Sequence, residues 1–165
     1  MTVLSAGILL YRVTEAGALQ VWIAHMGGPF WAHKDERAWS IPKGEYAAGE
    51  DPFAVAKREF EEEVGVPAPE VDYAELGEFR QPSGKVITVF TAEADAAFRV
   101  DRIISNTFPL EWPRGSGRVR DFPEIDDARW FTATDARARL VRGQVVVLDA
   151  LEQRVCPGDT VTGGE

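Results

Sequence analysis

Cysteine and long apolar runs are almost absent from this sequence, and each absence excludes a class of protein. The 165 residues contain one cysteine, Cys156, which can form neither an internal disulfide nor a thiolate metal site by itself. Apolar stretches such as 6–11 and 145–148 are far too short to span a bilayer. No basic residue precedes the first apolar stretch, so we expect no secretory signal and a cytoplasmic location.

Positive charge is also scarce. Lys and Arg number 18 against 27 Asp and Glu, which gives a formal net charge of −9 at pH 7. Nucleic acids and anionic membranes attract basic surfaces, so neither is an expected partner. The hydrophobic share of 45% is ordinary for a folded domain. The length suits one domain, which we expect to act on a small molecule as a monomer or a homodimer.

The chain shows no repeat and no linker, and its local patterns predict a mixture of strands and helices. Asp51 followed by Pro52 is typical of a helix start, and Gly65 is typical of its end. Apolar alternation and turn residues predict strands over 3–11, 19–25, 39–41, 71–79, 85–93 and 128–131, and helices over 52–64, 132–142 and 145–153. This order predicts an α+β fold, an α/β/α sandwich around a mixed sheet, in a single domain over 1–156 with a frayed tail over 157–165.

The segment 99–123 has no clear periodicity and contains five arginines and three prolines. It is too long for a passive connection in a compact domain. We therefore expect it to act as a functional flap.

Three glutamates crowd the end of the predicted helix over 52–64. Glu59, Glu62 and Glu63 are three and four positions apart, so they share one helical face. Their mutual repulsion amounts to a few tenths of a kcal/mol per pair, and the negative end of the helix dipole adds to it. A hard divalent cation such as Mg²⁺ reverses this penalty because it binds carboxylate oxygens. The pattern therefore indicates a metal site.

The segment from Gly44 to Val66 resembles the signature of the Nudix hydrolase family, G-x5-E-x7-R-E-U-x-E-E-x-G-U, in which U is a bulky apolar residue. Every fixed position is occupied, and Phe60 stands at the other apolar place. The fixed residues are Gly44, Glu50, Arg58, Glu59, Glu62, Glu63 and Gly65. The resemblance implies the Nudix-type sandwich and hydrolysis of a diphosphate linkage in a nucleoside diphosphate derivative.

The resemblance also implies roles for individual residues. Glu59, Glu62 and Glu63 would hold two or three Mg²⁺ or Mn²⁺ ions, with the backbone carbonyl of Lys43 as a further ligand. Glu124, six residues before Trp130, fits an additional glutamate that serves as a metal ligand or base. Those taken as catalytic are Arg58, Glu59, Glu63 and Glu124, and those taken as a structural brace are Glu50, which pairs with Arg58, Gly44 and Gly65.

The substrate class follows from residues around the signature. The Pro42-Lys43-Gly44 opening, the strand 85–90 and Glu124 before Arg129-Trp130-Phe131 resemble the diadenosine tetraphosphate hydrolases, which give ATP and AMP. Pro82, sixteen residues beyond Val66, is more typical of ADP-ribose pyrophosphatases. Hydrolysis of ADP-ribose or of oxidised nucleoside triphosphates therefore stays open, as does a non-catalytic nucleotide sensor.

Candidate substrate contacts are basic and aromatic side chains outside the helix. Lys43, Lys85 and Arg118 would meet phosphate oxygens, although Lys85 is as readily an exposed strand residue. Trp31 and Trp39 are candidates to stack on a base, although for either one an ordinary packing role is the better interpretation.

Overall fold

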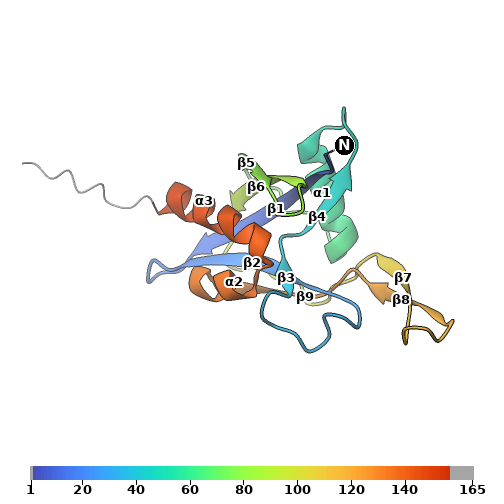
Figure 1. Cartoon of the computed structure of the whole chain (residues 1–165). Helices are drawn as coiled ribbons and strands as arrows, with labels where there is room; N and C mark the ends of the chain where they lie inside the picture. Colours follow the sequence, from blue (N-terminus) through green and yellow to red (C-terminus); the bar gives the residue numbers. More distant parts are fainter. Residues whose placement is uncertain (1, 157–165) are drawn as a thin grey trace, which may run out of the picture.

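A mixed sheet with helices on both faces forms the protein (Figure 1), and the computed structural model describes residues 2–156. The elements in chain order are β1 (Leu4–Val13), β2 (Leu19–Met26), β3 (Trp39–Ser40), β4 (Lys43–Tyr46), α1 (Pro52–Val64), β5 (Ala74–Arg80), β6 (Val86–Glu93), β7 (Thr107–Glu111), β8 (Val119–Pro123), β9 (Ile125–Thr132), α2 (Ala133–Arg139), the 3₁₀ turn η1 (Arg142–Gln144) and α3 (Val145–Val155).

The main sheet has seven strands. Five run in the order β3-β2-β1-β6-β5, while β4 pairs with β1 and β9 pairs with β2. The β1–β6 pair is parallel and the other pairs are antiparallel, which makes the sheet mixed. On the same edge, β1 pairs with β4 over its first residues and with β2 over its last.

Two apolar clusters lie on opposite faces of the sheet. Alternate residues of β2 separate the clusters, since Val21 and Ile23 belong to one and Trp22 to the other. The first cluster is completed by α2 and α3, and the second by α1. This is the period-two alternation of a sheet that is covered on both sides.

Helix α1 forms where the sequence predicts it. The Asp51 carboxylate accepts the N–H of Ala54 at 3.2 Å, and Gly65 ends the helix at φ 95°, a left-handed conformation that favours glycine. Its buried face carries Phe60, whose ring centroid lies 5.6 Å from that of Trp22. With this face buried, Glu59 and Glu63 in the last turns of the helix lie on the side of α1 that faces β4.

The predicted α+β sandwich around a mixed sheet is confirmed, and three strands were not predicted. Strand β4 lies in a segment of polar and glycine residues, and its pairing with β1 makes it a strand. Strands β7 and β8 form a hairpin within the expected flap, stabilised by pairing of Phe108 with Phe122. Helix α2 ends at Arg139, before the predicted Arg142, because the chain turns extended at Leu140.

The expected frayed tail over 157–165 lies outside the described residues. Within residues 2–156, no helix has the length and apolar character needed to cross a membrane.

Candidate functional site

Glu59 of α1 rests against β4 at Gly44. A Cβ atom placed on Gly44 would collide with the Glu59 carboxyl group, so the strand approaches the helix this closely only because residue 44 has no side chain. The Glu59 side chain is 18% exposed. Its carboxyl group therefore lies at the surface between helix and strand, where a ligand can reach it.

Glu63 lies one turn further along α1 and is held by the same strand. The backbone N–H of Lys43 donates a hydrogen bond to Glu63 Oε2 at 3.1 Å. Burial is the main reason that the pKa of Glu63 rises from 4.5 to about 8; the charges of Glu59 and Glu124 raise it as well, while Lys43 opposes them. An anionic Glu63 is therefore costly unless a cation joins it.

Glu124 reaches this part of α1 through the segment before β7. The N–H groups of Ile104 and Asn106 donate to the carbonyls of Val64 and Glu62 at 3.0 and 2.9 Å, and the N–H of Glu124 donates to the carbonyl of Asn106 at 2.8 Å. The last carbonyls of a helix have no partner within it, so these bonds complete the end of α1 and tie Glu124 to it.

The four carboxyl groups share one electrostatic neighbourhood. The pKa of Glu59 is raised first by burial and then by the charges of Glu62 and Glu124, while Arg58 lowers it. Because the same Glu124 also raises the pKa of Glu63, the structure brings these side chains together from two distant parts of the chain.

The predicted brace residues stand beside this cluster. The Arg58 guanidinium lies 3.5 Å from the carboxylate of Glu50 and 3.7 Å from that of Glu59. The N–H of Ala47 donates to Glu50 at 2.8 Å, which links the loop before α1 to the same pair. The side chains of Glu50 and Arg58 are nearly half exposed. An exposed ion pair adds little to the free energy of unfolding, so this pair serves mainly to orient the loop and the Glu59 side chain.

The donor set suits a hard divalent cation. Carboxylates and a backbone carbonyl are the ligands that Mg²⁺ takes in proteins, and the close approach at Gly44 places the Glu59 carboxylate against the strand that carries Lys43. Within residues 2–156 no three His, Cys, Asp or Glu side chains stand close enough together to form a ready-made metal site. Binding therefore requires rotation of side chains, which is open to Glu62 because it is exposed.

The predicted substrate contacts Lys85, Arg118 and Trp31 lie in different parts of the molecule. Lys85 forms an ion pair with Glu45 at 2.9 Å and is not part of the carboxylate cluster. Arg118 is exposed and lies just before β8. Trp31 is partly buried and packs against the apolar cluster of α2 and α3, with the Lys34 ammonium 5.8 Å from its ring centre.

Trp39 has an ordinary packing role in this structure and is not placed to stack on a base. The residue is 3% exposed and belongs to the apolar core. Its ring packs edge-on against Phe131 at 4.8 Å, and its Nε1 donates to Asp35 at 3.0 Å. These contacts occupy the surface that a base would need.

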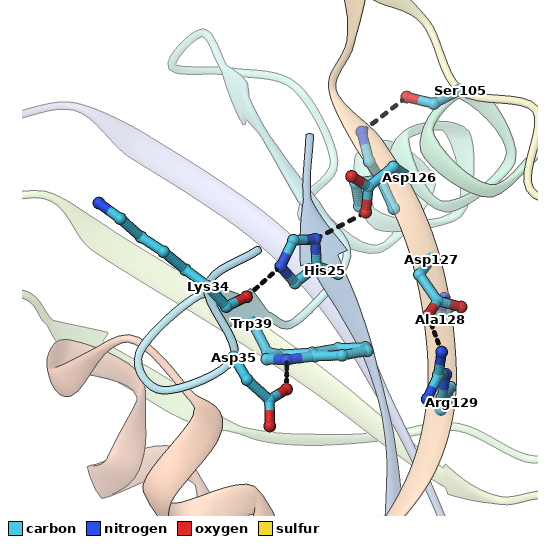
Figure 2. A network of polar contacts seen from close by, with 10 residues as sticks. His25, Lys34, Asp35, Trp39, Ser105, Asp126, Asp127, Ala128 and Arg129 are labelled. Carbon is cyan, nitrogen blue, oxygen red and sulfur yellow. Dashed lines mark hydrogen bonds and ion pairs between the residues drawn. The ribbon is translucent and has the colours of Figure 1, made fainter. Parts of the chain in front are cut away.

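Sequence reasoning missed one polar network near Glu124, shown in Figure 2. His25 of β2 lies between Asp126 of β9 and the backbone of Lys34. His25 and Asp126 are 101 positions apart, so no local pattern could have indicated the pair. Ser105 bonds the N–H of Ile125 at 3.1 Å in the same region.

The whole chain was compared with known proteins. The model of the NUDIX domain matches residues 1–151. The chain belongs to the Nudix domain family. Membership supports a pyrophosphohydrolase that acts on a nucleotide, a class that generally uses divalent metals such as Mg²⁺. Comparison with curated proteins gives no match.

Solved structures share this Nudix fold at low sequence identity. An Ap4A hydrolase binary complex from C. elegans has a TM-score of 0.63 and 17% identity, covering 92% of this chain and 97% of its own. The NUDIX domain of Shewanella oneidensis NrtR, complexed with ADP ribose, has a TM-score of 0.63 and 15% identity, covering 94% and 89%. RenU, a Nudix hydrolase from M. smegmatis, has a TM-score of 0.54 and 24% identity, covering 91% and 83%. At these identities the likeness concerns the fold alone.

Proposed function

We propose that this Nudix protein hydrolyses the diphosphate linkage of a dinucleoside polyphosphate, such as diadenosine tetraphosphate, to ATP and AMP. The observation that carries the proposal is the gathering of Glu59, Glu63 and Glu124, in which Glu124 raises the pKa of both other carboxyl groups and Glu59 raises that of Glu63. Such crowding favours a cation between the groups. The resemblance of the signature to other Nudix hydrolases supports the same reading.

The metal site would use the residues around Gly44. Glu59, Glu62 and Glu63 would hold Mg²⁺ or Mn²⁺, with the Lys43 carbonyl and Glu124 as further ligands. When bound, the metal neutralises the diphosphate charge and lowers the pKa of a bound water toward neutrality. Arg58 would keep the Glu59 carboxylate in place through the contact of 3.7 Å.

The chain's own groups then move the proton and meet the phosphate. A carboxylate of Glu59, Glu63 or Glu124 accepts a proton from water as the water oxygen bonds to phosphorus. The bond from phosphorus to the bridging oxygen breaks, and that oxygen leaves with the electron pair. The ammonium of Lys43, close enough to lower the pKa of Glu63, is suited to bind a phosphate oxygen.

The arginines of the β7–β8 hairpin favour a long polyanionic substrate. Within the described residues, Arg114, Arg118 and Arg120 have no acidic partner within 4 Å, although the protein is strongly acidic. The hairpin begins just after Asn106 and ends just before Glu124, so its base adjoins the carboxylate cluster. A dinucleoside polyphosphate has more phosphates than the metal site can contact, and these arginines suit the remainder.

A substrate panel tests this proposal. The protein is incubated with Mg²⁺ and diadenosine tetraphosphate, ADP-ribose or oxidised dGTP, and the products are separated by anion-exchange chromatography. We expect the highest kcat/KM for diadenosine tetraphosphate, with ATP and AMP as products. A preference for ADP-ribose would instead support the class of which Pro82 is typical. No turnover of any of them, with nucleotide affinity unchanged by Glu62→Gln, would support a sensor.

Variants of α1 test the assignment of the site. Glu63→Gln should lower kcat by at least about a hundredfold, the usual effect of removing a metal ligand or acid–base group. Glu61→Gln is the matched control, because Glu61 is exposed on the same helix and lies outside the fixed positions of the signature. Equal activity of the two variants would contradict the assignment.

A further inference from the structure

A buried histidine at the end of β2 contacts the strand that follows Glu124 (Figure 2). His25 is 9% exposed, and both ring nitrogens are engaged. Nδ1 lies 2.6 Å from Oδ1 of Asp126, and Nε2 lies 2.6 Å from the carbonyl oxygen of Lys34. Trp39 packs edge-on against the imidazole, with ring centroids 5.1 Å apart. The ring cannot turn without breaking two short hydrogen bonds in a packed environment.

The chemistry of the two partners shows what His25 does here. A backbone carbonyl only accepts, so Nε2 carries a hydrogen and donates it to Lys34. The other ring nitrogen, Nδ1, makes a short hydrogen bond of 2.6 Å with the Asp126 carboxyl group. His25 therefore fastens both β9 and the loop between β2 and β3 to the end of β2.

The bond with Asp126 is made at an irregular point of the sheet. His25 pairs with Asp127 across the strands, but the next residue, Met26, pairs with Ile125. Asp126 is therefore an extra residue on β9 without a partner on β2, which makes a β-bulge. A bulge bends its strand and redirects the neighbouring side chains.

Glu124 lies two residues before Asp126, the extra residue of the bulge. Its carbonyl accepts the N–H of Gly27 at 2.9 Å, and its own N–H donates to Asn106. The backbone on its other side continues through Ile125 into the bulge, where the His25 contact is the side-chain bond that holds Asp126. Glu124 is thus held by Asn106 and Gly27 at its own backbone, and it adjoins the bulge through Ile125.

We propose that His25 is a positioning residue, which fixes the bulge of β9 through Asp126 and so directs Glu124 toward Glu59 and Glu63. The proposal rests on the proposed function for the role of Glu124. Residues that orient a ligand or a catalytic group in this way typically change activity by about tenfold to a hundredfold when they are removed.

Two amide variants separate the two bonds of His25. The amide nitrogen of asparagine can stand near Nδ1 and keep the bond to Asp126, whereas that of glutamine can stand near Nε2 and keep the bond to Lys34. With diadenosine tetraphosphate and Mg²⁺, His25→Gln and His25→Phe should lower kcat about tenfold or more with little change in KM. His25→Asn should restore most of the kcat. A larger loss in His25→Asn than in His25→Gln would overturn the proposal.

Asp126→Ala tests the same contact from the partner's side. The Asp126 side chain is 40% exposed, so its removal should leave the fold intact while lowering kcat as His25→Phe does. Asp127→Ala is the matched control, since the neighbouring Asp127 pairs with Arg129 at 2.7 Å instead of with His25. A wild-type kcat in Asp126→Ala would overturn the proposal.

A double-mutant cycle separates this inference from the proposed function. If His25 acts through Glu124, His25→Phe should have little further effect in a Glu124→Gln background. A wild-type kcat in Glu124→Gln would overturn the role of Glu124 and the inference with it. A low kcat in Glu124→Gln, together with full additivity of His25→Phe, would overturn the inference alone.

Amide hydrogen exchange provides a readout that does not depend on turnover. In His25→Phe and His25→Gln, exchange should accelerate in peptides covering 124–127 while peptides from α1 stay unchanged. His25→Asn should keep the wild-type rate. Unchanged exchange over 124–127 in His25→Phe would overturn the proposal whatever the substrate.

Discussion

Glu63 is partly buried within a row of acidic side chains, and among the described residues Lys43 is the cation that lowers its pKa. Its carboxylate accepts the N–H of Lys43, but burial outweighs this bond and raises its pKa to about 8. The folded protein without metal therefore holds a proton on Glu63 at neutral pH, whereas the unfolded chain does not. This difference couples the stability of the protein to pH.

The coupling predicts how the metal-free protein responds to pH. As pH rises from 4.5 toward about 8, the unfolded chain loses this proton first, so the free energy of unfolding should fall by a few kcal/mol in total, at about 1.4 kcal/mol per unit of pKa shift. Glu63→Gln should remove most of this fall and be more stable than the wild type at pH 8. Urea unfolding in EDTA between pH 5 and 9 measures the effect, and parallel pH profiles of the two proteins would contradict it.

At the scale of elements, the site depends on the contact between α1 and β4. Gly44 makes this contact close enough for Glu59 to lie on the strand, while the bond from Lys43 holds Glu63 one turn further on. A strand and a helix end thus define the carboxylate positions together. Gly44 does not adopt a positive φ, so its role is steric.

This contact predicts the effect of Gly44→Ala. The added methyl group would displace the flexible end of the Glu59 side chain, so we expect kcat/KM to fall by about tenfold or more through misplacement of a reacting group. The midpoint of thermal unfolding should change little because no buried apolar group is lost. Ala48→Ser, exposed in the turn after β4, is the control. Steady-state kinetics of both variants test this expectation. A wild-type kcat/KM in Gly44→Ala would refute the steric argument.

In the whole molecule, two apolar clusters stabilise the sheet from its two faces. The electrostatic repulsion between acidic side chains is greatest near α1, where the glutamates crowd together. A cation that binds only the folded protein stabilises it by mass action, by about 2.7 kcal/mol at a hundredfold excess over Kd. The chain's net charge of −9 also responds to any salt through screening. A specific site and general screening therefore need separate controls.

We expect Mg²⁺ to raise the midpoint of thermal unfolding of the wild type by about 5–10 °C near saturation. NaCl at matched ionic strength should have a much smaller effect. The variant with both Glu62→Gln and Glu63→Gln should respond to Mg²⁺ no more than to NaCl. An equal rise in the wild type and the double variant, measured by calorimetry, would show that screening alone is responsible.

The parts of this protein that could be predicted from its sequence are those set by near neighbours. The start and end of α1 follow from Asp51, Pro52 and Gly65, and the glutamate row follows from helical spacing. Strand β4 and the β7–β8 hairpin could not be predicted because glycine, proline and charged residues interrupt their apolar alternation. Their hydrogen bonds come from pairing with β1 and with each other. The role of Trp39 could not be settled from sequence because an aromatic ring fits both a core and a binding surface.

The family and the acidic face of α1 follow from residues 44–66, because the signature and the helical spacing are both local patterns. Which groups stand beside that face depends on how distant segments fold against it. Glu124 reaches it through backbone bonds with 104–106, and His25 meets Asp126 across the bulge of β9. These contacts join residues about 20 to 100 positions apart, and such pairs are chosen by sheet register and by the packing of whole elements, which no local pattern encodes.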